Sequence, residues 1–441
     1  MQIQTLRLKN FRNFGDDTTS FELNPHFNVV IGANGSGKST LLDALRIVCG
    51  TYLLGIPDSE YRDRGKAIEF NDIRRSHGMK YELHTPVVVE ADGILITEST
   101  KNLALPITWR RQIPLNKTKT TATAEDVGML RDIAQNSYQQ MQQPNVVVDL
   151  PVLAFFDTCR LCGAGQSNLK TPRAGRDVFG EGYKDWKSIT ASNAQYPRWL
   201  GSYNVLLKNG REYAGTKEAF MEALFTANPY IEEAEFEAGE LWLKTDIDGE
   251  KQDFFPLSLC SDGIRSFTNI VAELAFRCIV LNAHYGKDAV KKSYGVVMID
   301  ELDLHLHPNW QRQVVGNLKA AFPNLQFVVS THSPFIVQSL RSDELITLGD
   351  MEGLEKDPRY YSIEDVAEAE MGIHDMPRSK HFVDMLETAK QYYALIAQGK
   401  SSKTDLETAS LRKKLNELEE RYSTDAAFVA FLKMKREAIN L

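Results

Sequence analysis

Short apolar runs and stretches of helical periodicity alternate along the chain and predict an α/β protein. Residues 27–31, FNVVI, and the run from Val296 to Ile299 are brief and rich in β-branched residues, as strands buried in a parallel sheet are. A third run lies in LQFVVSTHSPFIVQSL. The segment STLLDALRIVCG, after the first run, has apolar residues at helical spacing. We therefore expect a mostly parallel core sheet with helices packed against it.

Other segments predict elements around this core. Residues 81–113 indicate antiparallel strands with a turn at Ala91, Asp92 and Gly93, which would form a side sheet. Helices are expected over residues 124–143 and in WLGSYNVLL and TKEAFMEALF, before a hairpin in EEAEFEAGELWLKTD. Residues 163–184 are rich in Gly, Ser, Asn and basic residues and predict a loop.

The last part of the chain is expected to be helical. One helix is predicted over residues 379–398 and another in TDLETASLRKKLNELEERY. The second has an apolar stripe with alternating spacings of four and three, which would pack on the body or on a sister subunit: Leu411, Leu415, Leu418 and Tyr422. We expect four segments: an N-terminal lobe (1–160), a partly helical insertion (161–250), a C-terminal lobe (251–348) and a helical tail (349–441).

Composition and charge narrow the class of protein. Hydrophobic residues make up 43% and charged residues 25% of the 441 residues, which is typical of a globular protein. No apolar run approaches the ~20 residues that span a bilayer, and MQIQTLRLKN lacks the apolar core of a signal peptide. A cytoplasmic protein is therefore expected. The net charge of -8 argues against extensive coating of DNA but allows a local basic groove.

The five cysteines form an odd and sparse set that fits a reducing compartment better than a disulfide framework. Cys159 and Cys162 form a CxxC pair, but a structural zinc site needs about four ligands and no second pair completes it. Buried small side chains are the favoured interpretation over zinc binding or redox function.

The stretch GANGSGKST, residues 32–40, lies between a predicted strand and a predicted helix, as a phosphate-binding loop must. Its glycines let backbone N–H groups face phosphate oxygens, Lys38 reaches the outer phosphates, and the Ser39 hydroxyl is placed to ligate Mg²⁺. We expect ATP and Mg²⁺ here. The residues predicted to bind the nucleotide are Gly32, Asn34, Gly35, Ser36, Gly37, Lys38, Ser39 and Thr40.

Two later strand ends add acidic and imidazole groups. Asp300, at the tip of the run that ends at Ile299, is predicted to hold Mg²⁺ together with Ser39. Glu301 follows directly and could polarise the attacking water. His332 comes after the third apolar run, where it could bond the γ-phosphate.

A possible second anion site lies before a long apolar helix that starts near Arg265. Ser261, Asp262 and Gly263 stand at its N-terminus, where a hydroxyl and free N–H groups favour an anion. Because the first loop already surrounds the phosphates from its own side, a second site indicates nucleotide held by another subunit. A plain Ser/Asp helix cap is the alternative.

Along the chain the motifs follow in the order glycine loop, Ser-Asp-Gly before a helix, strand with Asp-Glu, and strand with histidine. In this order they resemble the motifs of ABC-type ATPases of the RecF, SMC and OLD-like group, and LRLKNFRNF resembles their first strand. The resemblance implies that CSDGI, residues 260–264, is the signature loop usually written LSGGQ. It also implies that Asp300 is the Walker B acid, Glu301 the general base and His332 the switch histidine. Cys260 and Ile264 depart from the signature pattern.

LDLHLHP stands where the D-loop of these ATPases would run, and its form is similar to that of the OLD-like and RecF-like branch. A metal site at His305 and His307 is the alternative. The glutamine of the Q-loop is not placed: Gln112 and Gln166 are both conceivable.

Four stretches are similar to those of the PtuA-type ATPases of Septu and related anti-phage systems: LPVLAFFDTCRL, LCSDGIRS, IDELDLHLHP and YSIEDVAEAEMGIHDMPRSKHF. This resemblance implies a homo-oligomer built from ATP-bridged pairs, in which Lys38, Ser39 and Asp300 face Ser261 and Gly263 of another subunit. It also implies a separately encoded HNH-type nuclease as partner. Residues 349–441 contain no DxD, so we expect no nuclease in this chain.

Three other functions remain open at this stage. A RecF-like repair ATPase would bind DNA directly, and residues 101–120 offer basic side chains beside Trp109: Lys101, Arg110, Arg111, Lys117 and Lys119. A solvated loop is the alternative for this stretch. A transporter subunit is disfavoured because Ile264 replaces the usual glutamine. Finally, ATP could be bound with little turnover and act as a ligand.

Overall fold

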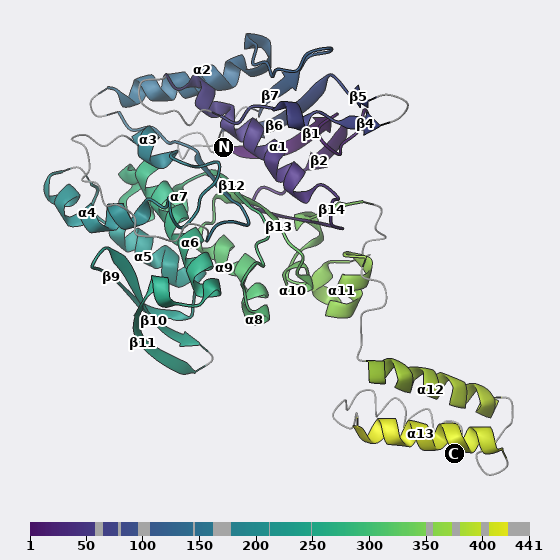
Figure 1. The fold of residues 1–441 in the computed structure, drawn as a ribbon. Helices are drawn as coiled ribbons and strands as arrows, with labels where there is room; N and C mark the ends of the chain where they lie inside the picture. Colours follow the sequence, from purple (N-terminus) through teal and green to yellow (C-terminus); the bar gives the residue numbers. More distant parts are fainter. Residues whose placement is uncertain are drawn as a thin grey trace. The chain divides into compact units, whose positions relative to one another are not determined.

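The computed structural model describes residues 1–57, 65–77, 81–95, 106–143, 146–161, 178–210, 212–247, 249–349, 356–372, 380–397 and 405–421. The chain divides into two compact units, Met1–Gly372 and Ile373–Leu441 (Figure 1). The four segment boundaries expected from the sequence stay a prediction.

A five-stranded parallel sheet lies at the centre of the first unit, as expected. Its strands are, in order across the sheet, β14 (Leu345–Leu348), β3 (Phe27–Gly32), β13 (Leu325–Ser330), β12 (Gly295–Ile299) and β8 (Val152–Phe156). Almost every residue of β3, β13, β12 and β8 is buried, which explains their continuous apolar runs. Because the strands are parallel, their carboxyl ends meet at one edge.

The antiparallel side sheet is also confirmed. Its strands are, in order, β2 (Thr19–Glu22), β1 (Gln2–Lys9), β6 (Val87–Ile94) and β7 (Pro106–Ile113). The predicted turn at residues 91–93 is wrong, because β6 runs straight through these positions. Ala91 pairs with Leu6 on one side and with Trp109 on the other, so the flanking strands hold this segment extended.

Several predicted helices are confirmed to within a few residues: α2 (Ala124–Met141), α4 (Tyr196–Lys208), α5 (Thr216–Ala227), α12 (Lys380–Ala397) and α13 (Leu406–Arg421). The helix after the glycine loop is α1 (Lys38–Gly50), which begins where β3 and its loop end. Other short helices and strands are β4 (Arg75–His77), β5 (Tyr81–Leu83), α3 (Val178–Gly182), α7 (Ala289–Lys292), α8 (Pro308–Gln311), α9 (Val314–Ala321), α10 (Pro334–Val337) and α11 (Ile363–Ala369). α3 lies within residues 163–184, so the predicted loop is wrong for this part of the stretch.

The predicted hairpin before the signature stretch is confirmed and has a third strand. β9 (Ile231–Glu237), β10 (Glu240–Ile247) and β11 (Glu250–Pro256) form an antiparallel sheet. β11 leads through residues 257–261 into α6 (Asp262–Leu281), the longest helix of the described residues. The small sheet is therefore joined to α6 by a short connection (Figure 1).

A buried ion pair fastens the insertion to α6. Glu273 and Arg277, both at 0% exposure, lie one helical turn apart and are joined at 3.0 Å. The Glu273 carboxylate accepts the backbone N–H of Gln195, at 2.8 Å, where α4 begins. Arg277 donates to the carbonyls of Gly182 and Lys184 at the end of α3. Burial raises the pKa of Glu273, against the opposing effect of Arg277.

In the second unit, α12 and α13 lie side by side and share a small core (Figure 1). Ala389 and Tyr392 of α12 pack with Leu415 of α13, and Leu411 lies against this cluster. The apolar stripe of α13 thus packs on α12 at Leu411 and Leu415, whereas the side chains of Leu418 and Tyr422 lie outside the described residues. Among the described residues, no helix is long and apolar enough to cross a membrane.

Replacing Glu273 with alanine should destabilise the first unit strongly, because it leaves Arg277 buried without its carboxylate. We expect a loss of about 3–5 kcal/mol in the free energy of unfolding. Glu222→Ala is the matched control: its partner Lys291 is about half exposed, so its loss should stay below about 1 kcal/mol. Chemical denaturation followed by tryptophan fluorescence measures both, and equal losses would contradict a special role of the buried pair.

Candidate functional site

The glycine loop between β3 and α1 has the backbone of an anion-binding turn. Gly35 and Gly37 have φ of 81° and 109°, in the left-handed region that favours glycine. A Cβ at Gly37 would lie 2.5 Å from the side-chain nitrogen of Asn13, and that nitrogen donates to the carbonyl of Ser36 at 2.9 Å. Asn13 follows β1 and was not singled out by sequence analysis. Its side chain stabilises the loop through the hydrogen bond to Ser36.

Lys38 lies at the base of the loop with only 8% of its surface exposed. Its Nζ donates to the carbonyls of Gly32 and Ala33, at 2.8 and 3.2 Å. Burial lowers its pKa, whereas the nearby carboxylates of Asp300 and Glu301 raise it. Around it, Asn34 and Ser39 are exposed and Thr40 is half-buried, and the buried Ser36 hydroxyl has no described hydrogen-bond partner.

The Asp300 carboxylate joins three segments at the carboxyl edge of the sheet. Its Oδ2 accepts the Ser39 hydroxyl at 2.9 Å, and its Oδ1 accepts the Ser330 hydroxyl from the end of β13. Ser330 Oγ in turn accepts the backbone N–H of Glu301 at 2.8 Å. The structure thus brings together the two residues predicted to hold Mg²⁺.

Glu301 and the segment that contains His332 are positioned by their backbones. Glu301 has φ of 50°, an uncommon left-handed conformation for a side chain of this kind. Asp303 Oδ1 accepts the Thr331 hydroxyl at 2.6 Å and the backbone N–H of His332 at 3.2 Å. Asp303 therefore ties the segment after β12 to the segment after β13 and leaves the His332 side chain exposed.

The signature stretch starts α6. Ser261 occupies the N-cap position, but its exposed side chain makes no capping bond, so the plain-cap interpretation fails. Asp262 pairs with Arg265 at 3.0 Å. Gly263 is buried: a Cβ there would lie 2.5 Å from the carbonyl of His305, so the helix packs directly on the backbone after β12. No described hydrogen bond joins Ser261, Asp262 or Gly263 to residues 32–40 of the same chain.

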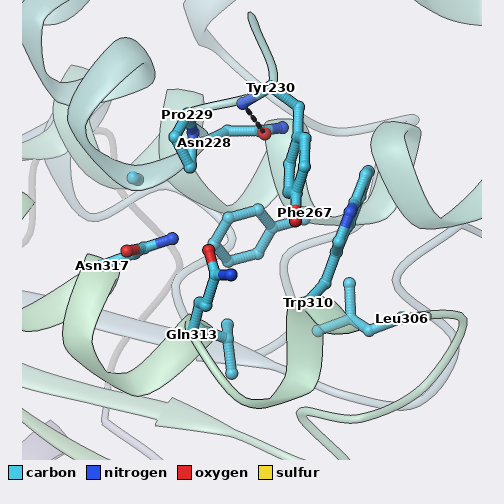
Figure 2. Close-up of a pocket in the computed structure, with 10 residues that line it drawn as sticks. Asn228, Pro229, Tyr230, Phe267, Leu306, Trp310, Gln313 and Asn317 are labelled. Carbon is cyan, nitrogen blue, oxygen red and sulfur yellow. Dashed lines mark hydrogen bonds between the residues drawn. The ribbon is translucent and has the colours of Figure 1, made fainter. Parts of the chain in front are cut away.

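A small apolar pocket continues this contact between α6 and the segment after β12. Figure 2 shows Phe267 of α6 beside Leu306 and Trp310. Trp310 stacks on Tyr230, with ring centroids 4.9 Å apart and an interplanar angle of 19°. The end of the insertion therefore also touches the segment after β12.

Arg160 is a buried residue near the site that sequence analysis missed. It follows β8, the strand beside β12, and its guanidinium donates to the carbonyls of Asp300 and Glu301, both at 2.8 Å. The one local signal was an arginine four residues after a buried strand.

The basic stretch beside Trp109 is not a free groove. Trp109 is buried and donates its ring N–H to the carbonyl of Val48. Arg111 is 4% exposed, and Arg110 pairs with Asp126 of α2. The hypothesis of an exposed aromatic and basic surface is wrong for Trp109 and Arg111, whereas the side chain of Arg110 is 39% exposed. Lys117 and Lys119 are exposed, and Lys101 lies outside the described residues.

The other sequence hypotheses have mixed outcomes. Cys49 and Cys278 are buried free thiols and Cys260 is a half-buried one, whereas the exposed Cys159 is disulfide-bonded, contrary to expectation. Cys162 and Gln166 lie outside the described residues.

Gln112 donates to Asp126 on α2. The His307 ring nitrogen accepts the backbone N–H of Asn309 at the start of α8, and His305 is exposed with φ of 69°.

The residues of the edge fit a nucleotide with Mg²⁺. A hydroxyl and a carboxylate, from Ser39 and Asp300, are the oxygen ligands that Mg²⁺ prefers. Lys38 supplies a buried cation, and the space where a Cβ of Gly35 would stand is open. The buried Ser36 hydroxyl without a described partner adds a free polar group to the same loop.

Comparison with known families gives two matches that overlap at residues 191–196. A family model described as "AAA domain" matches residues 5–196, and one described as "AAA domain, putative AbiEii toxin, Type IV TA system" matches residues 191–338. Among solved structures, the crystal structure of the SmcHead bound to the C-winged helix domain of ScpA has 16% sequence identity and a TM-score of 0.45. That alignment covers 81% of this chain and 95% of the other.

Curated relatives match parts of the chain. "Retron Vc95 probable ATPase" of Vibrio cholerae is 32% identical over 32% of this chain and 27% of its own length. "Septu protein PtuA" of Bacillus thuringiensis is 32% identical over 29% and 34%, respectively. "Retron Ec83 probable ATPase" of Escherichia coli is 22% identical over 78% and 71%. The chain thus spans about a third or less of the first and second of these relatives. The chain is thus similar to the Septu PtuA proteins and the retron ATPases, and the two AAA-domain models together match residues 5–338.

Proposed function

We propose that the chain binds ATP with Mg²⁺ between paired subunits and hydrolyses it. The observation that supports this most directly is the contact between Ser39 Oγ and Asp300 Oδ2 at 2.9 Å, which joins the glycine loop to the acidic strand end. The AAA-domain matches and the relatives named as ATPases support the same activity.

On the first subunit, the loop N–H groups of residues 32–40 and the Lys38 ammonium bind the phosphates. Binding requires Lys38 Nζ to exchange its carbonyl partners, Gly32 and Ala33, for phosphate oxygens. Mg²⁺, held by Ser39 and Asp300, neutralises charge on the terminal phosphates when it is bound. Asn34, Gly35, Ser36, Gly37 and Thr40 complete the loop.

Glu301 is the proposed general base. Its carboxylate accepts a proton from water as the water oxygen forms a bond to the γ-phosphorus and the bond to the β-phosphate oxygen breaks, which releases ADP and phosphate. His332, exposed at the neighbouring strand end, donates a hydrogen bond to the γ-phosphate. Ser261, Asp262 and Gly263 contribute the first turn of α6 from the second subunit. No described hydrogen bond joins them to residues 32–40 of their own chain, which is consistent with this arrangement.

We further propose that ATP-dependent pairing regulates a separately encoded HNH-type nuclease in a complex that defends against phage. The similarity to the Septu PtuA proteins supports this role. The insertion supports it physically, because Glu273 and Arg277 fasten it to α6, so a partner bound there would be linked to the helix that meets the nucleotide.

Native mass with and without ATP–Mg²⁺ tests the assembly. The wild-type chain should pair with ATP and release phosphate. Glu301→Gln should keep the pair and slow phosphate release by about 10²–10⁴-fold, because it removes the base. Lys38→Ala should abolish ATP-dependent pairing. If the wild-type chain and both variants form the same oligomer and none releases phosphate, hydrolysis-coupled pairing is ruled out.

Ser39→Ala tests the metal site. Without the hydroxyl, Mg²⁺ should no longer strengthen ATP binding, so the affinity with Mg²⁺ should fall about tenfold, to the level measured in EDTA. Titration with a fluorescent ATP analogue measures this. Ser202→Ala is the control, since that hydroxyl bonds carbonyls of its own helix. A Mg²⁺ effect that survives in Ser39→Ala would disprove this ligand assignment.

A further inference from the structure

Arg160 has a fully occupied guanidinium at the back of the site. The residue is 3% exposed, and burial lowers its pKa to about 10 against the raising effect of the carboxylates around it. An arginine has five N–H donors in a fixed fork. Five acceptors lie within 3.3 Å: Ser266 Oγ and the carbonyls of Asp157, Asp300, Glu301 and Leu304. A buried cation with every donor used can adopt only one position.

These acceptors belong to parts that are far apart in the sequence. Nε donates to Ser266 of α6 at 2.8 Å, whereas Nη1 and Nη2 reach the carbonyls of Asp300 and Glu301 at the same distance. Arg160 therefore links the first turns of the signature helix with the backbone at the carboxyl end of β12.

The hydrogen bond from Arg160 holds the backbone of Glu301 in its left-handed conformation. Left-handed φ at a residue other than glycine persists only when its surroundings impose it. Here the carbonyl of Glu301 is held by Arg160, and its N–H by the Ser330 hydroxyl. The direction of the Glu301 carboxylate follows from this backbone, so a small shift of either side chain would redirect it.

A movement of the start of α6 would displace the hydrogen bonds that hold the backbone of Glu301. Ser266 is 2% exposed and lies one turn after Gly263, where the helix touches the carbonyl of His305 without room for a Cβ. Phe267 packs beside Leu306 and Trp310 in the pocket of Figure 2. The polar fork and the apolar contact lie on the same end of α6, so that end and the segment after β12 form one packed unit.

We propose that Arg160 is a positioning residue that links the first turns of α6, through Ser266, to the backbone of Glu301 in the same subunit. Docking of α6 on the nucleotide of the other subunit would then set the direction of the Glu301 carboxylate, the general base. This deepens the proposed function and rests on it. Arg160 touches neither water nor nucleotide in this scheme; it acts through Glu301.

Ser266→Ala is the decisive variant, because it removes only the α6 arm of the fork. We expect kcat for phosphate release to fall at least about tenfold with KM unchanged, since misplacing a reacting group is costly while binding is untouched. Arg160→Lys, which cannot fork, should have the larger effect. Ser293→Ala is the control: it is equally buried and bonds the carbonyls of Cys278 and Ala289, so it should lose similar thermal stability but keep its turnover.

A second readout separates positioning from general damage. In the Glu301→Gln background, Ser266→Ala should cause no further loss of the residual turnover, because both changes remove the same contribution. An additional loss of the full size seen in the wild type would overturn the proposal. So would an unchanged kcat in Ser266→Ala.

Hydrogen exchange distinguishes failure of this link from failure of the proposed function. ATP–Mg²⁺ should slow exchange of amides in residues 300–306 of the wild type, and Ser266→Ala should abolish that effect while the loop at residues 32–40 remains protected. If the wild type shows this pattern but releases no phosphate, the link stands and hydrolysis fails. If ATP protects residues 300–306 equally in Ser266→Ala, or in neither protein, the link is wrong.

Discussion

The Asp300 carboxylate is the contact on which the arrangement of the site depends. It accepts one hydroxyl from the start of α1 and one from the end of β13, and so holds three chain segments at one edge of the sheet. This is possible because β13 lies between β3 and β12, which brings the glycine loop and the acidic pair to opposite sides of one strand. Asp303 repeats the pattern one step further on by accepting from Thr331 and His332. The strand order thus brings the glycine loop, the acidic pair and the segment that contains His332 to one edge of the sheet.

The helix α6 links this edge to the rest of the first unit. One end contacts the segment after β12 through Gly263 and accepts a hydrogen bond from Arg160 through Ser266. The middle holds the insertion through Glu273 and Arg277. A buried ion pair is costly to desolvate and adds little net stability compared with apolar side chains, but it fixes geometry where its groups bond to defined partners. Here both Nη groups of Arg277 have such partners, whereas its Nε has none among the described residues. Glu273 and Arg277 meet backbone groups of α3 and α4 at defined points, so the insertion follows the helix. We see in this a physical reason why a helix, rather than a loop, connects the two regions.

Sequence analysis predicted the elements whose signal is local. Continuous apolar runs predicted β3, β12 and β13, and helical periodicity predicted α2, α4 and α5. The resemblance directed attention to the glycine loop and the acidic pair. Sequence analysis failed where segments distant in the sequence determine the conformation or burial of a residue. Asp92 and Gly93 have turn chemistry, yet β1 and β7 hold them in a strand, and Asp92 pairs with Arg7. Arg160 could not be found because four of its five acceptors lie more than a hundred residues away, at Ser266 and at residues 300–304. Burial of Trp109 and Arg111 likewise depends on packing that no local pattern contains.

The burial of Cys260 and Ile264 explains why these two positions can depart from the signature pattern. Ile264, where the pattern has glutamine, is 5% exposed and belongs to the main core, and Cys260 is half-buried with its thiol directed to the carbonyl of Pro256. Only Ser261 and Asp262 of the five positions are exposed. A carboxylate beside phosphate would oppose binding, but Arg265 pairs with Asp262 and offsets its charge, which leaves the N-terminal dipole of α6 positive. The face that we propose for nucleotide therefore consists of the Ser261 hydroxyl and free N–H groups, and the two altered positions change how the loop packs on its own subunit.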